Sequence, residues 1–95
     1  MTPQLPSLEL IESQHSFPGP YIFKVIGDHR EDFVADALSL ALNSLGDDRD
    51  FQHSTRPSKS GQHLALTLSL TLNSAAEVHG VYENLLKLNG LRALF

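Results

Sequence analysis

Five histidines are the first residues of this chain that could do chemistry, because imidazole is the commonest nitrogen ligand for metal ions. They are His15, His29, His53, His63 and His79. No two of them stand three or four residues apart on a predicted helix, and no acidic residue lies between His53 and His63, which share a predicted hairpin. The chain also has no cysteine. We therefore expect no metal site and no bound cofactor.

Nucleophilic catalysis would need a serine or threonine beside an oriented base. The chain has many serines, but none lies on a glycine-flanked elbow. The acidic residues at positions 28–32 and 47–50 are better explained by a helix start and a solvated loop than by paired catalytic carboxylates. The sequence therefore predicts that the protein is not an enzyme.

The segment Gly27-Asp28-His29-Arg30 joins a predicted strand to a predicted helix. Free amide groups and the helix dipole can make such a corner a pocket for an anion or a small ligand. The simpler interpretation is a turn that requires glycine for its backbone geometry. An acylphosphatase-like reaction is disfavoured because Asp28 places a carboxylate where the anion would sit. An anion-binding corner with weak hydrolase-like activity, carried by His29 and Arg30, is the alternative to a non-catalytic role.

A basic group follows in the predicted hairpin, where Arg56 and Lys59 could dock an acidic partner, although two charges on a loop are usually only solvated. Lys24 stands on the uncovered face of the first predicted strand. These residues and the corner make up the group that we predict to lie nearest any ligand or partner: Lys24, Gly27, Asp28, His29, Arg56 and Lys59. We predict no catalytic residue.

Length and composition limit the possible roles. The chain has 95 residues, 41% of them hydrophobic, and a formal net charge of −4. This length suits one domain, and so few basic residues argue against broad binding to nucleic acid. No apolar stretch approaches the length of about 20 residues that spans a bilayer. The first 14 residues have no basic residue, unlike a secretory signal, so we expect a soluble cytoplasmic protein.

The first half of the chain predicts an arm, a strand and a helix. Residues 1–16 form a loosely docked arm in which Ser7 can cap one or two amphipathic turns. A turn rich in proline at 17–20 leads into a strand at 21–26, which is ended by Gly27. Asp28 and Glu31 have the spacing of a capping box, so the helix is expected from there to Leu45, with Gly46 after its end and a solvated loop at 47–50.

The second half predicts a hairpin, a helix and a last strand. A polar strand at 51–56 and a turn at 57–61 precede five leucines that alternate with small residues, at 64, 66, 68, 70 and 72. This period of two places the leucines on one face of a central strand. Ser74 and Glu77 form a second capping box for a helix that Asn89-Gly90 ends, and 91–95 is a short strand.

These elements predict an α+β fold, a ferredoxin-like βαββαβ two-layer sandwich with an antiparallel sheet in the order 4-1-3-2. The domain would span residues 17–95 after the arm. Both helices would cover the leucines. The other face of the sheet would be open and would lack the aromatic residues that stack RNA bases in related folds. The first and the last predicted strands would contribute Ile22, Lys24, Ile26, Arg92 and Leu94 to this face.

Several segments of the chain resemble one family: 20–27 (Pro-Tyr-Ile-Phe-Lys-Val-Ile-Gly), 56–58 with Gly61, Val78 with Tyr82-Glu83 and Lys87, and Arg92. Across roughly residues 16–95 the chain is similar to the YbeD-like family of small uncharacterised bacterial proteins. The resemblance implies a ferredoxin-like fold similar to ACT regulatory domains and a role tied to lipoate metabolism. We therefore expect a small regulatory or protein-interaction module whose partner is an unknown protein or a small metabolite, with a homodimer as a further possibility.

Overall fold

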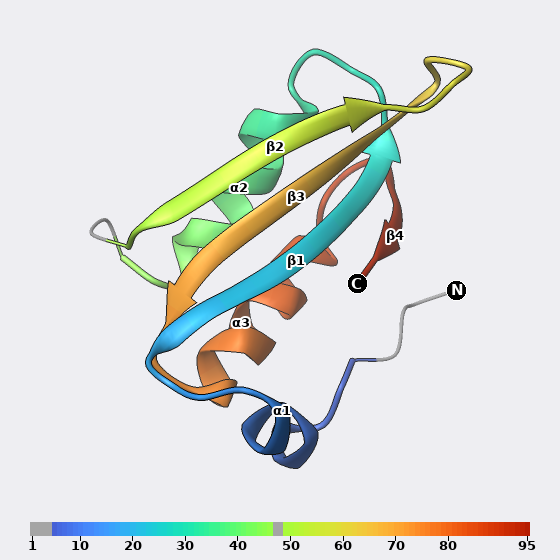
Figure 1. Ribbon diagram of the computed structural model, residues 1–95. Coiled ribbons are helices and arrows are strands. Elements are labelled where there is room, and N and C mark those ends of the chain that lie inside the picture. Colours follow the sequence, from blue (N-terminus) through green and yellow to red (C-terminus); the bar gives the residue numbers. More distant parts are fainter. Residues whose placement is uncertain (1–4, 47–48) are drawn as a thin grey trace.

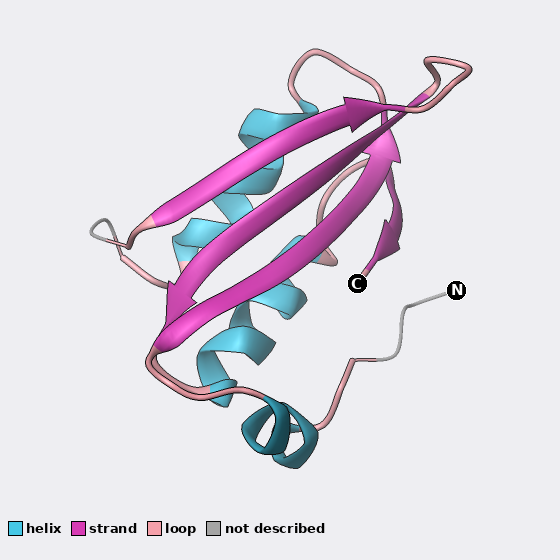
Figure 2. Ribbon diagram, viewed as in Figure 1, coloured by secondary structure: helices cyan, strands magenta, loops and turns pink. Residues whose placement is uncertain are grey.

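The structure is a computed structural model, and it describes residues 5–46 and 49–95. The elements follow one another as a short helix, a strand, a helix, a hairpin, a helix and a last strand (Figures 1 and 2). Their bounds are α1 Leu8–Gln14, β1 Gly19–Asp28, α2 Phe33–Asn43, β2 Phe51–Pro57, β3 His63–Leu72, α3 Ala75–Leu85 and β4 Leu91–Leu94. None of these helices is long and apolar enough to cross a bilayer.

The four strands form one antiparallel sheet in the order β2-β3-β1-β4. Read from the other edge, this is the order 4-1-3-2 that the sequence predicts. Figure 2 shows α2 and α3 together on one side of the sheet, with the opposite side uncovered. The chain therefore has two layers, and one whole sheet face is left for other contacts.

The core lies between the sheet and these two helices. Leu66, Leu68, Leu70 and Leu72 are completely buried, and Leu64 is 8% exposed. The predicted leucine face is thus confirmed. Phe23 and Val25 of β1 lie beside these leucines on the same sheet face, and Val78 and Val81 of α3 and Phe33 of α2 complete the core.

The capping box predicted at Asp28 and Glu31 does not form, because β1 continues past Gly27 and includes Asp28. Asp28 is still paired with His63 of β3 and donates its amide to the carbonyl of Gly90. Sheet pairing therefore takes the residues that a helix start would need, and α2 begins only at Phe33, after Asp32. The helix also ends earlier than predicted, at Asn43 and not at Leu45, with Ser44 as its C-cap. Gly46 has a φ of 83°, the left-handed conformation expected of a glycine shortly after a helix end.

The second capping box is confirmed in part. The Ser74 hydroxyl accepts a hydrogen bond from the Glu77 backbone amide at 3.2 Å, but the Glu77 carboxylate accepts from the backbone amide of Asn73 instead of that of Ser74. The Ser7 hydroxyl caps α1 in the same way, with Leu10 as the donor. Ile11 of α1 is 2% exposed and belongs to the core, so the arm is anchored by at least this side chain. The predicted loop at 47–50 falls partly on residues 47 and 48, which lie outside the described part of the chain.

Leu94 was expected on the open face, and this is wrong. It pairs with Val25, faces the helices and is 7% exposed. The pairing register between β1 and β4 shifts between Ile26 and Gly27. Such a bulge adds one residue to a strand and changes which side chains face the core. Ala93 and the terminal Phe95 therefore take the open face in place of Leu94.

Candidate functional site

Gly27, one of the residues predicted to lie nearest any ligand or partner, is required here for close packing. A Cβ atom at this position would lie 2.2 Å from Cε1 of Phe33 and 2.8 Å from the carbonyl oxygen of Gly90. Real Cβ atoms do not approach other atoms so closely, and no larger residue fits. The Phe33 ring occupies the corner beside Gly27, where an anion would have to sit.

The backbone amides of the corner are already hydrogen-bonded. The amides of Asp28 and His29 donate to the carbonyls of Gly90 and Gln62, each at 3.0 Å. The Arg30 amide donates to the Asp28 carbonyl at 2.9 Å. An anion site at a helix start depends on amides without such partners. These three amides therefore offer no cradle for a phosphate or carboxylate.

The side chains of the corner connect neighbouring elements. The Asp28 carboxylate accepts a hydrogen bond from Nε of Arg92 at 2.9 Å. Nδ1 of His29 donates to the carbonyl of Gly61 in the hairpin loop, also at 2.9 Å.

Arg30 makes three contacts in this corner. Its guanidinium pairs with Asp36 at 2.9 Å, donates to the Asn89 carbonyl at 3.0 Å, and lies 5.8 Å from the centre of the Phe33 ring. The corner joins β1, α2, the hairpin and β4, and its polar groups are engaged with one another.

The open face of the sheet carries two more of the predicted residues, Lys24 and Arg56. Strand pairing aligns its side chains in cross-strand rows: Ser54, Thr67 and Lys24 form one row, and Arg56, Ala65 and Ile26 form the next. Strand β3, which lies between β1 and β2, supplies only the small side chains of Thr67 and Ala65 to these rows. The sheet surface is therefore lower along β3 than at Lys24 and Arg56. Lys24 and Arg56 line one hollow of about 340 Å³ with Ser54, Thr55, Ala65 and Thr67.

An exposed apolar group surrounds Lys24. Phe95 pairs directly with Lys24, with backbone hydrogen bonds of 2.9 Å in both directions, and its side chain is 66% exposed. Ile22, two residues before Lys24 on the same face, is 63% exposed. These are the two most exposed large hydrophobic residues in the described part of the chain. We call Ile22, Lys24, Ile26 and Phe95 the Lys24 patch.

The predicted site residues lie in three separate places in the structure. Lys24 and Arg56 share the hollow on the open face, whereas Gly27, Asp28 and His29 belong to the corner. Lys59 is exposed in the hairpin loop, outside the hollow. Within residues 5–46 and 49–95, no carboxylate lies within ion-pair distance of Lys24 or Arg56, and no group of three potential metal ligands is brought together.

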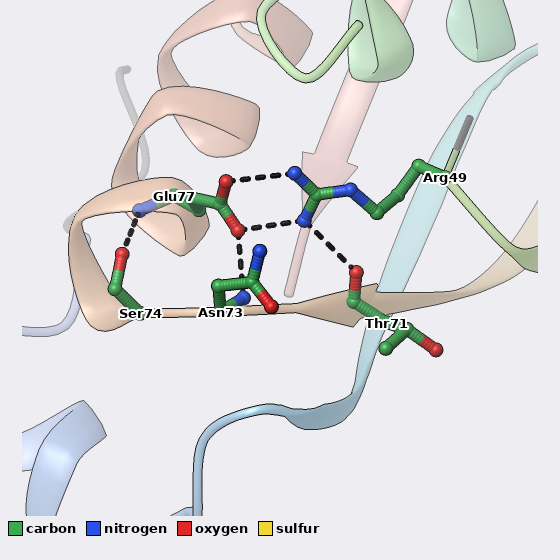
Figure 3. Close-up of polar contacts among 5 residues, drawn as sticks. All are labelled: Arg49, Thr71, Asn73, Ser74 and Glu77. Atoms are coloured by element: carbon green, nitrogen blue, oxygen red, sulfur yellow. Dashed lines mark hydrogen bonds and ion pairs between the residues drawn. The ribbon is translucent and has the colours of Figure 1, made fainter. Parts of the chain in front are cut away.

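An ion pair between Arg49 and Glu77 was not foreseen from the sequence. The guanidinium donates to both carboxylate oxygens, at 2.7 and 2.9 Å, and to the carbonyl of Thr71 at 3.1 Å (Figure 3). The Glu77 carboxylate also accepts a hydrogen bond from the backbone amide of Asn73 at 2.6 Å. The bond from Arg49, partly opposed by burial, holds the pKa of Glu77 below its usual value, and the same bond raises the pKa of Arg49. The pair fastens the start of β2 to the start of α3.

Comparison with known proteins identifies one family. The model of the family described as "Protein of unknown function (DUF493)" matches residues 12–94. A UPF0250 protein of Shewanella halifaxensis is 31% identical over 84 residues, which are 88% of this chain and 89% of the relative. A UPF0250 protein of Haemophilus ducreyi is 31% identical over 91 residues, 95% of this chain and 87% of the relative.

The fold of this chain is also found among solved structures. The solution structure of protein HP0495 from H. pylori matches with a TM-score of 0.70 and covers 98% of this chain and 97% of its own. Its sequence identity of 14% is too low to carry more than the fold.

Proposed function

This chain belongs to the DUF493 family of proteins of unknown function, and we propose that it is a non-catalytic interaction module that binds a partner protein on the open face of its sheet. In this proposal the architecture is ferredoxin-like, the protein acts in the cytoplasm, and binding serves regulation. The link to lipoate metabolism remains a prediction from the family resemblance.

The Lys24 patch is the observation that carries the proposal. A folded chain that exposes Ile22 and Phe95 by more than 60% leaves apolar area in water that a partner could bury. Aromatic and large aliphatic side chains at the centre of an interface supply most of its binding energy. The patch lies on a sheet face that no other element of the described chain covers, so a partner can reach it without rearrangement.

The charge of Lys24 indicates what the partner must offer. An ammonium group between apolar neighbours loses water when a partner covers it, and this costs free energy unless an acidic group replaces the water. The partner should therefore present apolar side chains around a carboxylate. The small side chains of β3 leave room for such a segment between β1 and β2, with the hydroxyl groups of Ser54 and Thr67 as additional hydrogen-bonding groups.

The hydrogen bonding of the corner at residues 27–30 supports a non-catalytic role. His29 and Arg30, the residues of the hydrolase-like alternative, are bound to Gly61, Asp36 and Asn89. A general base must reach a substrate proton, and an oxyanion needs free donors. A screen of phosphate and acyl esters tests this part of the proposal. Hydrolysis that disappeared in both His29→Ala and Arg30→Ala, with the fold retained, would show that the alternative is correct.

The binding proposal is tested by affinity capture from a bacterial extract with matched variants. We expect Lys24→Glu and Ile22→Ser to lose partner proteins that the wild type retains. The controls are Lys87→Glu and Leu10→Ser, which make the same changes at exposed positions away from the sheet. Captured proteins are quantified by mass spectrometry. If the patch variants and the wild type retained the same proteins in equal amounts, the open face would not be the binding surface.

A further inference from the structure

Strand β2 is an uncovered edge of the sheet. All seven of its residues, Phe51–Pro57, are exposed. The carbonyl of Asp50 accepts from the Thr71 amide, so residues 50, 52, 54 and 56 direct their backbone groups toward β3. The amides and carbonyls of the residues between them, Phe51, His53 and Thr55, must therefore face outward. Such an edge can pair with another strand.

Apolar side chains accompany this edge on the helix side. Phe51 is 40% exposed and stacks against His53, with 6.2 Å between the ring centres. On α2, Val34 and Leu38 are only half buried, as is Leu45, which lies two residues after the helix end. These side chains add apolar surface on the helix side of the sheet.

The side chains of β2 give the edge a charge pattern that matches itself. Asp50, which lies one residue before β2 and opposite Thr71, and Arg56 both lie on the open face, and each is three residues from His53. In an antiparallel pair of two identical strands centred on His53, each Asp50 would stand opposite the Arg56 of the other copy. Opposite charges in directly opposed positions stabilise a strand pair.

We propose that β2 pairs antiparallel with β2 of a second copy of this chain, in the register that places the two His53 residues opposite each other. Phe51 then lies opposite Thr55, and these are the residues with outward amides and carbonyls. The two sheets become one sheet of eight strands, with the open faces on one side. This proposal uses the outward edge of β2, whereas the proposed function uses the Lys24 patch, which lies on β1 and at Phe95 directly after β4. Arg56 also lines the hollow beside Lys24, so a variant of Lys24 is needed to separate the two.

The backbone and the charges select the same register. Hydrogen bonding requires the residues with outward groups to oppose one another, so the partner strand can shift only by two residues at a time. A shift in either direction would move Asp50 from Arg56 to Ser54 or Ser58 of the other copy. Among the residues that the structure describes, only the central register places an acidic side chain opposite a basic one. The other edge strand, β4, has four residues and offers a much shorter ladder.

Charge reversal on the full chain tests the register. Sedimentation velocity over a wide range of concentrations measures dimer formation by the wild type, Arg56→Asp, Asp50→Arg and the double variant that carries both changes. Each single change puts like charges opposite each other at two symmetric positions, so we expect the dimer to weaken by about tenfold or more. The double variant restores opposite charges in the same register and should dimerise like the wild type. Circular dichroism checks that each variant is folded.

Lys24→Glu is the control, because it changes charge on the same face but outside the edge. It should leave dimerisation unchanged even where it abolishes partner capture. Hydrogen exchange gives a readout without substitution: the amides of Phe51, His53 and Thr55 should gain protection as concentration rises. A wild type that stayed monomeric, an unchanged dimer in Arg56→Asp, or a folded double variant that failed to recover would each overturn the proposal.

Discussion

Replacing Glu77 with alanine should destabilise the fold well beyond what the loss of a surface charge would do. The substitution removes the two hydrogen bonds from Arg49 and the acceptor of the Asn73 amide. The side chains of Arg49 and Glu77 are 17% and 25% exposed, so water can compensate only in part.

The size of the effect follows from this partial burial. Exposed ion pairs contribute about 0.2–1 kcal/mol, whereas breaking a fully buried pair costs about 3–5 kcal/mol. A two-bond pair of intermediate burial should lie between them, so we expect Glu77→Ala to lower the free energy of unfolding by about 2 kcal/mol. For a domain of this size, the melting temperature would fall by about 8–16 °C.

Urea unfolding measures this change, with Glu83→Ala as the control on the exposed side of the same helix. The control should stay within about 0.5 kcal/mol of the wild type. A double-mutant cycle with Arg49→Ala should give a coupling energy of about 1–2 kcal/mol. If Glu77→Ala and Glu83→Ala had equal midpoints, or if the coupling were zero, the ion pair would not fasten β2 to α3.

The ion pair between Arg49 and Glu77 also predicts how the stability of the fold depends on pH. The pKa of Glu77 is lower in the folded chain than its usual value, so the unfolded chain binds the proton more readily. The stabilisation is therefore complete above the unfolded pKa of about 4.3 and is lost as pH falls through the lower folded pKa. Glu77→Gln has no such proton to bind and should lose less stability between neutral and acidic pH than the wild type. Equal losses would contradict the assignment.

Two further predictions concern packing. Leu68→Ala should cost about 2–5 kcal/mol because Leu68 is completely buried, whereas Thr67→Ala on the open face should cost less than about 1 kcal/mol; equal shifts in urea midpoint would mean that the faces are wrongly assigned. Gly27→Ala should destabilise the chain by about 2 kcal/mol or more, because its Cβ would meet the Phe33 ring. Gly80→Ala, whose Cβ would be 3.6 Å from the nearest atom, should be neutral or stabilising in thermal unfolding, and the reverse order of these two glycine variants would refute the packing described at Gly27.

The elements that were predicted well have signals that lie within a few residues. The alternating leucines of β3 define their buried face by period alone, and Ser74 with Glu77 defines the start of α3. The capping signal at Asp28 and Glu31 failed because strand pairing and the Gly90 carbonyl compete for the same residues. Local sequence does not reveal that competition.

The candidate site was predicted only in part for the same reason. The placement of Lys24 on the open face followed from the alternation of β1. Phe95 was missed because the bulge at Ile26 and Gly27 decides which residues of β4 face outward. The partnership of Arg49 with Glu77 joins residues 28 positions apart, and no local spacing indicates it.

Site-specific photocrosslinking tests the central claim, binding on the open face, most directly. A photoreactive amino acid replaces Gln52, which lies on the open face in the row of Ile22, or Ser39, which is exposed on α2. Mass spectrometry separates links to other proteins from links between copies of this chain. We predict that the probe at Gln52 links a partner protein and that Lys24→Glu abolishes the link, while the probe at Ser39 gives none. A partner linked from Ser39 and not from Gln52 would contradict the claim.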